Sequence, residues 1–146
     1  MTIRPAEAAD RPAVEAIVRA AYAPYVARIG MEPGPMRDDY AARIARGEAW
    51  VHEDRDGVGG VVVVILGDDA LLDNVAVAPR LRGRGVGRRL IDHAESVARR
   101  AGHGTIRLYT HVAMTENRAL YPRLGYAETH RATEHGLDRV YYAKAL

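Results

Sequence analysis

The chain has 146 residues, a formal net charge of +2 and a hydrophobic fraction of 48%. This length and hydrophobicity favour a single packed core and exclude a disordered chain. The absence of cysteine excludes disulfides, thiolate metal sites and a cysteine nucleophile, and it fits a reducing compartment.

The first third of the chain predicts a short strand, a helix and a loop. The strand is expected at residues 3–5, and Asp10 is placed to cap a helix whose apolar residues keep helical spacing as far as Tyr22. Pro24 and the glycine- and proline-rich residues 30–35 are expected to break this helix and to form a loop.

A second helix and a hairpin are predicted next. Apolar residues recur every four positions over residues 36–44, and Gly47 is placed to end that helix. Two strands, at residues 50–53 and 61–66, flank a turn that contains Asp56 and Gly57. The second strand is continuously apolar, which is typical of a strand covered on both faces.

The rest of the chain alternates strands and helices before a closing hairpin. The expected elements are a strand at 71–77, a helix at 86–100, a strand at 106–110, a short helix capped by Thr115 that ends near Gly125, and strands at about 126–132 and 139–146. This order predicts the α/β (α+β) class, with a mixed sheet that has helices on both faces.

The sequence pattern also argues against membrane insertion and secretion. The amino-terminal residues are charged throughout, and the most apolar stretch, residues 58–66, is too short to cross a bilayer. We therefore expect a soluble cytoplasmic protein.

A strand that ends in Val-Ala-Val-Ala-Pro runs into a glycine-rich turn and then into an amphipathic helix. The first amides of a helix have no partner within it, and together with the helix dipole they form a phosphate site. Neighbouring arginines add charge; they are Arg80, Arg82, Arg84, Arg88 and Arg89. The spacing excludes both a P-loop and a dinucleotide-binding G-x-G-x-x-G loop, in which Arg88 would stand at the last glycine.

The string R-x-x-G-x-G, formed by Arg82, Gly85 and Gly87, resembles the coenzyme A pyrophosphate loop of the GNAT acetyltransferases. The segment TENRALYPRLGY, residues 115–126, resembles the family's N-x-x-A-L-Y-x-x-L-G-F segment, with Tyr126 in place of phenylalanine and a shorter spacing after the asparagine. The element order resembles the family over essentially the whole chain. The resemblance implies one domain, residues 1–146, with a mostly antiparallel central sheet of about seven strands flanked by helices.

The resemblance also implies a site for acetyl-coenzyme A. Val75 and Val77 would pair with pantetheine through main-chain groups, a strand amide at Val75 or Ala76 would hold the oxyanion, and Asn117 would contact the coenzyme arm. The pyrophosphate would be held by the amides of the loop, namely those of Arg82, Gly83, Arg84, Gly85, Val86, Gly87 and Arg88.

Acetyl transfer from a thioester to an amine requires two proton transfers. The resemblance places the Tyr121 hydroxyl near the thioester sulfur; with an ordinary pKa of about 10, a tyrosine stays protonated at neutral pH and can donate to the leaving thiolate. The substrate ammonium must lose its proton to Asp73, the nearby carboxylate on the strand, or through water. Strand alternation leaves open whether Asp73 faces the site or the surface.

The long loop after the first helix is expected to cover the acceptor. Tyr25 and Met31 in this loop are candidate substrate contacts, and His111, at the end of the fifth strand, is a third. The histidines show no metal-ligand spacing, so no metal is expected. The acceptor amine is left open between a small molecule, an amino-acid derivative and a peptide, and the apolar strands at the carboxyl end are compatible with a homodimer.

Two other functions are compatible with parts of the sequence. A non-catalytic sensor of acyl-coenzyme A would keep the phosphate loop without turnover, and the presence of Tyr121 argues against it. A nucleic-acid-binding domain would use the arginine cluster, but the small net charge and the lack of aromatic residues among the arginines disfavour it. We therefore expect neither nucleic acid nor a membrane as a partner.

Overall fold

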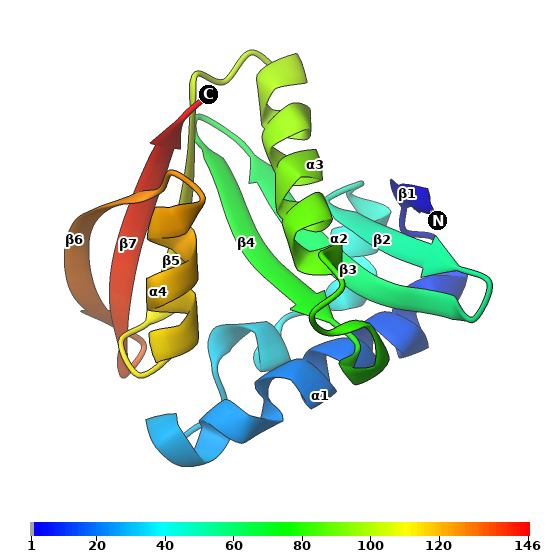
Figure 1. Ribbon diagram of the computed structural model, residues 1–146, viewed down its shortest axis with the longest axis horizontal. Helices are drawn as coiled ribbons and strands as arrows, with labels where there is room; N and C mark the ends of the chain where they lie inside the picture. The colour runs from blue at the N-terminus through cyan, green and yellow to red at the C-terminus, as the bar shows by residue number, and fades with distance from the viewer. Residues whose placement is uncertain (1) are drawn as a thin grey trace.

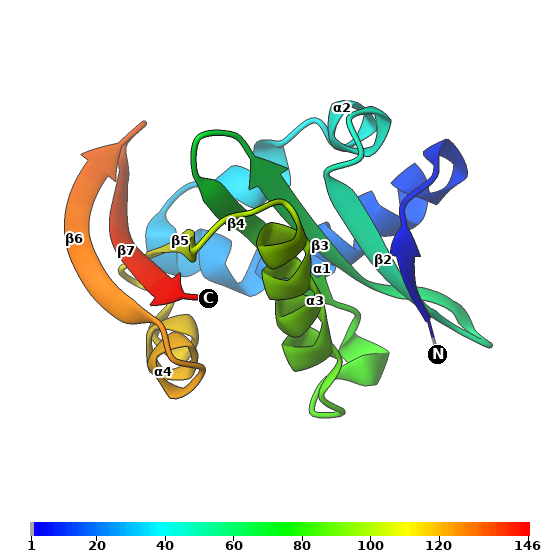
Figure 2. The same ribbon diagram turned by 90° about the horizontal axis from the view of Figure 1, so that it is seen from above.

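A mixed sheet runs through the middle of the fold and carries helices on both faces (Figures 1 and 2). A computed structural model describes residues 2–146, and over this range the sheet has seven strands in the order β1-β2-β3-β4-β5-β7-β6. The strands are β1 (Thr2–Pro5), β2 (Ala49–Asp54), β3 (Gly57–Leu66), β4 (Ala70–Val77), β5 (Thr105–His111), β6 (Ala127–Glu134) and β7 (Leu137–Ala145). Neighbouring strands are antiparallel except β4 and β5, which are parallel.

The helices form two layers. They are α1 (Arg11–Ile29), α2 (Tyr40–Ala45), α3 (Val86–Arg100) and α4 (Thr115–Arg123), with 3-10 turns η1 (Ala8–Asp10), η2 (Gly34–Arg37) and η3 (Pro79–Leu81). Helices α3 and α4 cover one face of the sheet, and α1 and α2 cover the other (Figure 2). No helix within residues 2–146 is long and apolar enough to cross a bilayer.

Strand β3 supplies side chains to both hydrophobic cores. Val62 and Val64 pack in the core beneath α3, whereas Val61 and Val63 pack in the core beneath α1. Burial of an aliphatic side chain of this size stabilises the fold by roughly 1.5–3 kcal/mol. The structure thus confirms the expectation that this apolar strand is covered on both faces.

Helix α1 is longer than the sequence predicts. Pro24 lies inside α1, and the helix continues to Gly30, whose φ of 86° is left-handed and whose amide donates to the Val26 carbonyl. Pro24 is exposed. On the exposed side of a helix, water can hydrogen-bond to the carbonyl that a proline leaves without a partner. The expected break at Pro24 was therefore wrong.

Two other helix starts also differ from expectation. The periodic residues 36–44 split into η2 and α2, because Asp39 caps α2 by accepting a hydrogen bond from the Ala42 amide at 3.1 Å. In α4, Met114 occupies the cap position and Thr115 is the first helical residue, its hydroxyl donating to Glu116 instead. Helix α3, by contrast, has the bounds that the sequence predicts.

Strands β4 and β5 part soon after they meet. Their pairing is confined to Ala70 with Ile106 and Leu71 with Arg107. Beyond these pairs the two strands diverge, as Figure 1 shows, and the lower half of β4 has no strand on its β5 side. This opening lies at the centre of the sheet, between the two helix layers.

A buried carboxylate fixes the last hairpin to α3. Glu95 of α3, whose side chain is 4% exposed, accepts hydrogen bonds from the Tyr126 hydroxyl at 2.9 Å and from the Lys144 ammonium at 3.0 and 3.1 Å. Lys144 lies on β7, and Tyr126 directly precedes β6. The contact therefore holds both strands of the hairpin against α3.

Removal of this carboxylate should destabilise the fold. Glu95→Ala leaves the Tyr126 hydroxyl and the Lys144 ammonium without their partner, so we expect the free energy of unfolding to fall by about 2–3 kcal/mol. Urea denaturation measures this change. The control is Glu128→Ala, which removes an exposed pair with Arg131 and should change stability by less than about 0.5 kcal/mol. Equal effects of the two substitutions would contradict the structural role of Glu95.

Candidate active site

A β-bulge turns Asp73 toward the opening. In the β3–β4 register, Val63 pairs with Asn74 and Val64 pairs with Leu72, so Asp73 is the extra residue on β4. Because a bulge adds one residue, it reverses the faces on which the following side chains lie. Leu72 packs on the α3 side, and Asn74 points to the α1 side. Simple alternation therefore could not place Asp73.

The carboxyl-terminal half of β4 presents to the opening a backbone edge that no strand covers, where the Val75 carbonyl accepts a hydrogen bond from the Tyr22 hydroxyl at 3.3 Å. The Ala78 amide donates to the Gly59 carbonyl of the β3 side at 2.8 Å. Since the N–H and C=O groups of successive residues point to opposite edges of a strand, those of Val75 and Val77 face the opening, and those of Ala76 face β3. Of the two amides expected for an oxyanion, the one at Val75 is therefore the better placed.

The glycine-rich turn aims free amides outward at the start of α3. Gly83 and Gly85 have φ values of 76° and 78°, a left-handed conformation that glycine adopts without strain. The first helical hydrogen bond of α3 runs from the Arg89 amide to the Gly85 carbonyl at 3.1 Å. The amides of residues 86–88 thus have no partner inside the helix, at the position where the sequence predicts an anion site.

The arginines around this turn divide into two groups. Arg80 forms an ion pair with Asp54 at 3.0 Å and so faces away from the turn. Arg82, Arg84 and Arg88 are exposed, and within residues 2–146 none of the three forms an ion pair. Arg82, Arg84 and Arg88 therefore supply cationic charge near the helix start.

Two hollows meet at the opening between β4 and β5. The Asp73 cavity has a volume of about 520 Å³ and is lined by Tyr22, residues 33–35, residues 72–75, residues 109–111, Met114, Asn117, Tyr121, Leu137 and Arg139. The Arg82 groove has a volume of about 820 Å³ and is lined by Ala21, Tyr22, Pro24, Tyr25, Arg28, residues 75–77, Arg82, Met114 and Asn117. Tyr22, Val75, Met114 and Asn117 line both hollows, so the two adjoin at the edge of β4.

Five of the expected site residues line the Asp73 cavity. They are Asp73, Val75, His111, Asn117 and Tyr121. Burial raises the pKa of the Asp73 carboxyl above its ordinary value, and the nearby Asp38 raises it further. Burial also raises the pKa of Tyr121 well above 10, so this hydroxyl stays protonated at physiological pH. Asn117, which lines both hollows, donates a hydrogen bond to the Thr110 hydroxyl at 3.3 Å.

His111 offers the cavity a hydrogen-bond donor. Its Nδ1 accepts a hydrogen bond from the Ala113 amide at 3.0 Å, which leaves the proton of the neutral ring on Nε2. Burial lowers the pKa of His111, so the neutral ring is favoured.

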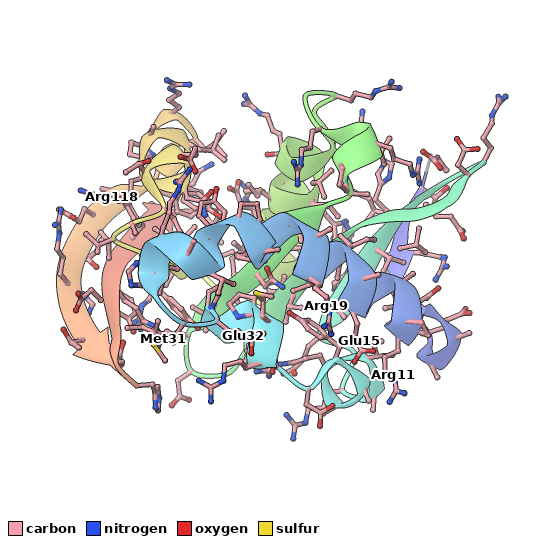
Figure 3. The ribbon with its side chains drawn as sticks, turned by 90° about the horizontal axis from the view of Figure 1, so that it is seen from below. Arg11, Glu15, Arg19, Met31, Glu32 and Arg118 are labelled. Carbon is pink, nitrogen blue, oxygen red and sulfur yellow. The ribbon has the colours of Figure 1, made fainter. Side chains whose placement is uncertain are left out.

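The other two substrate candidates lie elsewhere. Tyr25 lines the Arg82 groove, where its hydroxyl donates to Glu116 at 2.6 Å; burial and this carboxylate raise the pKa of Tyr25 to about 12. Arg28 also donates to Glu116, at 2.8 Å, so Glu116 ties α1 to α4 across the groove. Met31 lines neither of these hollows, and it lies beside the hairpin turn at Gly136 (Figure 3).

A buried hydrogen-bond chain joins the walls of the cavity. The Tyr22 hydroxyl donates to Asn74 Oδ1 at 2.7 Å, Asn74 Nδ2 donates to the Tyr40 hydroxyl at 2.9 Å, and that hydroxyl donates to the Pro35 carbonyl at 2.5 Å. The chain links α1, β4, α2 and the loop of residues 33–35. These hydrogen bonds therefore hold α1, α2 and residues 33–35 in fixed positions around β4.

The sequence did not single out Arg139 and Tyr109 as site residues. They face each other from β7 and β5, with the guanidinium carbon 4.3 Å from the ring centroid. Their proximity depends on the antiparallel register that pairs His111 with Arg139. In the sequence, only the position of Arg139 near the start of the last strand indicated that it could lie near the site.

Comparisons with known proteins agree with this architecture. The family model described as an acetyltransferase (GNAT) domain matches residues 45–128, more than half of the chain. No curated protein sequence matches the chain significantly.

Solved structures share the fold. The PaiA N-acetyltransferase from Thermoplasma acidophilum, in complex with coenzyme A, superposes with a TM-score of 0.80 at 17% identity over 99% of this chain and 98% of that one. The ribosomal-protein-S18-alanine N-acetyltransferase from Escherichia coli gives 0.78 at 23% identity over 99% and 92%. A nourseothricin acetyltransferase gives 0.61 at 27% identity, but the match spans 66% of this chain and 64% of that one. The expected sheet of seven strands with flanking helices is thereby confirmed.

The buried carboxyl of Asp73 should make the stability of the protein depend on pH. Because the pKa of Asp73 is raised in the folded state, the unfolded chain ionises first as pH rises past about 4, and the folded state loses stability until its own pKa is passed. Asp73→Asn removes this loss. We expect the variant to gain stability over the natural protein at pH 7, and the gain to shrink near pH 4.

Urea unfolding at the two pH values measures this difference. The dependence of the unfolding free energy on urea concentration serves as the control, because an unchanged slope shows that both proteins unfold from the same folded state. An equal gain in stability at both pH values would show that ionisation of Asp73 does not destabilise the folded protein.

Proposed function

We propose that this chain, which belongs to the GNAT acetyltransferase family, transfers the acetyl group of acetyl-coenzyme A to the nitrogen of a primary amine. One observation carries the proposal: the Arg82 groove and the Asp73 cavity adjoin at the free edge of β4. The groove suits a long anionic donor, and the cavity suits an amine. In this proposal the whole chain, residues 1–146, acts as one domain, and the two reactants meet in a ternary complex.

The residues present fit the donor. The outward amides of residues 86–88 and the free guanidinium groups near them suit a pyrophosphate, and Arg82 lines the groove that leads from there to β4. The PaiA neighbour, solved with coenzyme A, supports this assignment. The bound donor supplies an acetyl group activated as a thioester.

Val75 and Tyr121 would stabilise the two negative charges that the reaction creates. As the amine nitrogen bonds to the acetyl carbon, the carbonyl oxygen gains charge, which the Val75 amide at the edge of β4 is placed to hold. When the carbon–sulfur bond breaks, the sulfur keeps the electron pair, and the Tyr121 hydroxyl donates a proton to it. Tyr121 would then regain a proton from the solvent.

Asp73 is the group best placed to prepare the amine. An amine must lose the proton of its ammonium form before it attacks, and a second proton leaves once the new bond has formed. Asp73 lines the cavity, and its raised pKa makes it a better proton acceptor than an ordinary aspartate. The products are the N-acetylated amine and free coenzyme A, with one proton released for each ammonium acetylated.

Loss of the Tyr121 hydroxyl should slow turnover without weakening donor binding. We expect Tyr121→Phe to lower kcat by about 100-fold or more, with little change in the KM for acetyl-coenzyme A, because only the leaving thiolate uses this proton. The assay follows the release of free coenzyme A over a panel of primary amines. The matched control is Tyr142→Phe, which removes a hydroxyl from the ring 6.1 Å away and should leave kcat within about twofold. Unchanged turnover in Tyr121→Phe would remove it as the acid.

The two ends of α3 provide a matched test of the phosphate site. Gly85 and Gly102 both have a left-handed φ, at the start and the end of the helix. Gly85→Glu places a carboxylate where the pyrophosphate would lie, so calorimetric titration with acetyl-coenzyme A should show no binding. Gly102→Glu carries the same backbone strain and the same charge, and it should bind normally.

The outcome of that titration separates the competing functions. Normal binding by folded Gly85→Glu would overturn the placement of the pyrophosphate. Binding by the natural protein without turnover of any amine would instead support a non-catalytic sensor of acyl-coenzyme A.

A further inference from the structure

We propose that the acceptor is a free amino acid with an apolar side chain, held in the Asp73 cavity with its ammonium group at Asp73 and its carboxylate at Arg139. This inference rests on the proposed function, because it names the amine that the acetyl group would reach. It follows from two opposite charges that line one cavity without touching each other.

Arg139 brings a positive charge to one end of the cavity. Its side chain is 12% exposed, and its guanidinium carbon lies 4.3 Å from the centroid of the Tyr109 ring. Its nearest carboxylate, Glu134 at 3.6 Å, is beyond ordinary hydrogen-bond length and also accepts a hydrogen bond from the Tyr141 hydroxyl. Since a guanidinium has five N–H donors in a planar fork, Arg139 keeps donors for a carboxylate.

A second donor lies beside Arg139. His111 pairs with Arg139 across the β5–β7 ladder, and both line the cavity. The neutral His111 ring carries its proton on Nε2, because Nδ1 is taken by the Ala113 amide. A carboxylate at this end would therefore meet a cation and a neutral donor.

Asp73 brings a negative charge to the other part of the same cavity. Across residues 2–146 it forms no ion pair, either with Arg139 or with another cation. Behind it, Arg43 is already held by Asp38 at 2.9 Å and by Glu48 at 3.1 Å. These three carboxylates outnumber the single cation, so this part of the cavity attracts an ammonium group.

A zwitterion can pair with Asp73 through its ammonium group and with Arg139 through its carboxylate at the same time. A simple amine would leave Arg139 with only the more distant Glu134 as its anion, and a peptide terminus has an uncharged amide where a free amino acid has its carboxylate. Between the two charges the walls are largely apolar; they include Tyr22, Pro33, Pro35, Leu72 and Leu137.

The test compares acceptors that differ only in the carboxylate. The acceptors are L-leucine and L-phenylalanine, the matched amines isoamylamine and phenethylamine, and the amides L-leucinamide and L-phenylalaninamide. We expect kcat/KM for the amino acids to exceed that of the matched amines and amides by about 30-fold or more. Arg139→Gln should abolish this preference, and Arg139→Lys, which keeps the charge but loses the planar fork, should retain part of it.

The matched control is Arg131→Gln. Arg131 is exposed on β6 of the same hairpin and pairs with Glu128, so its loss should leave the preference unchanged. An equal loss of activity toward all acceptors in Arg139→Gln would indicate a structural role and overturn the proposal. Amides that react as well as the amino acids would overturn it in favour of a peptide terminus.

Calorimetric binding to the protein saturated with coenzyme A separates this proposal from the proposed function. If amines are acetylated without preference for the carboxylate, the amino-acid site is refuted and the acetyltransferase stands. If no acceptor is acetylated, but L-leucine or L-phenylalanine binds to the natural protein and not to Arg139→Gln, the amino-acid site stands and the acetyltransferase is refuted. If no acceptor binds or reacts, both are refuted.

Discussion

Hydrogen bonding along β4 is the constraint on which the site depends. A strand in the middle of a sheet ordinarily satisfies its backbone groups on both edges, and β4 does so only where it pairs with β5 at Ala70 and Leu71. Farther along, the edge at Val75 and Val77 has no strand beside it, and the fold leaves space there instead of filling it. Backbone groups that a folded chain leaves unpaired in a hollow favour a ligand that can pair with them. The proposed donor, an extended amide-containing arm, has the chemistry to act as the missing strand.

The bulge at Asp73 places a carboxylate at this opening, where two hollows adjoin. With strict alternation, Asn74 would point to the same side as the α3 core, and the chain from Tyr22 through Asn74 to Tyr40 would not form. One additional residue in β4 places Asp73 at the cavity, directs Asn74 to the α1 layer and leaves Val75 packed on the other side. A local irregularity thereby sets the position of the carboxylate and of both hollows.

Local patterns in the sequence predicted the elements better than they predicted the site. Helix α3 was predicted with its observed bounds because its apolar face and its flanking glycines are all contained in one segment. Helix α1 was underestimated at Pro24, since the tolerance of a proline depends on which face is exposed. The glycine-rich turn before α3 could be located from the sequence because its spacing is local.

The site residues that the sequence could not place depend on pairing between strands that are far apart in the chain. The direction of Asp73 depends on a bulge that only the β3–β4 register reveals, and Arg139 reaches the cavity through a register between β5 and β7. Tyr25 and Met31 were expected together in a loop over the acceptor. Instead, the extension of α1 separates them, with Tyr25 in the Arg82 groove and Met31 beside the last hairpin.

The contact of Glu95 with Lys144 and Tyr126 has a consequence for how such a protein can change its specificity. The same helix whose first amides would face the phosphates of the proposed donor also holds, in its third turn, the hairpin that carries Arg139. Under the proposed function, helix α3 would thus set the distance between the bound donor and the residues that select the acceptor. Substitutions in residues 33–35, which line the Asp73 cavity, would change the acceptor site while this distance stays constant. The proposal therefore allows the acceptor to diverge among related proteins while the residues that would hold the donor stay unchanged.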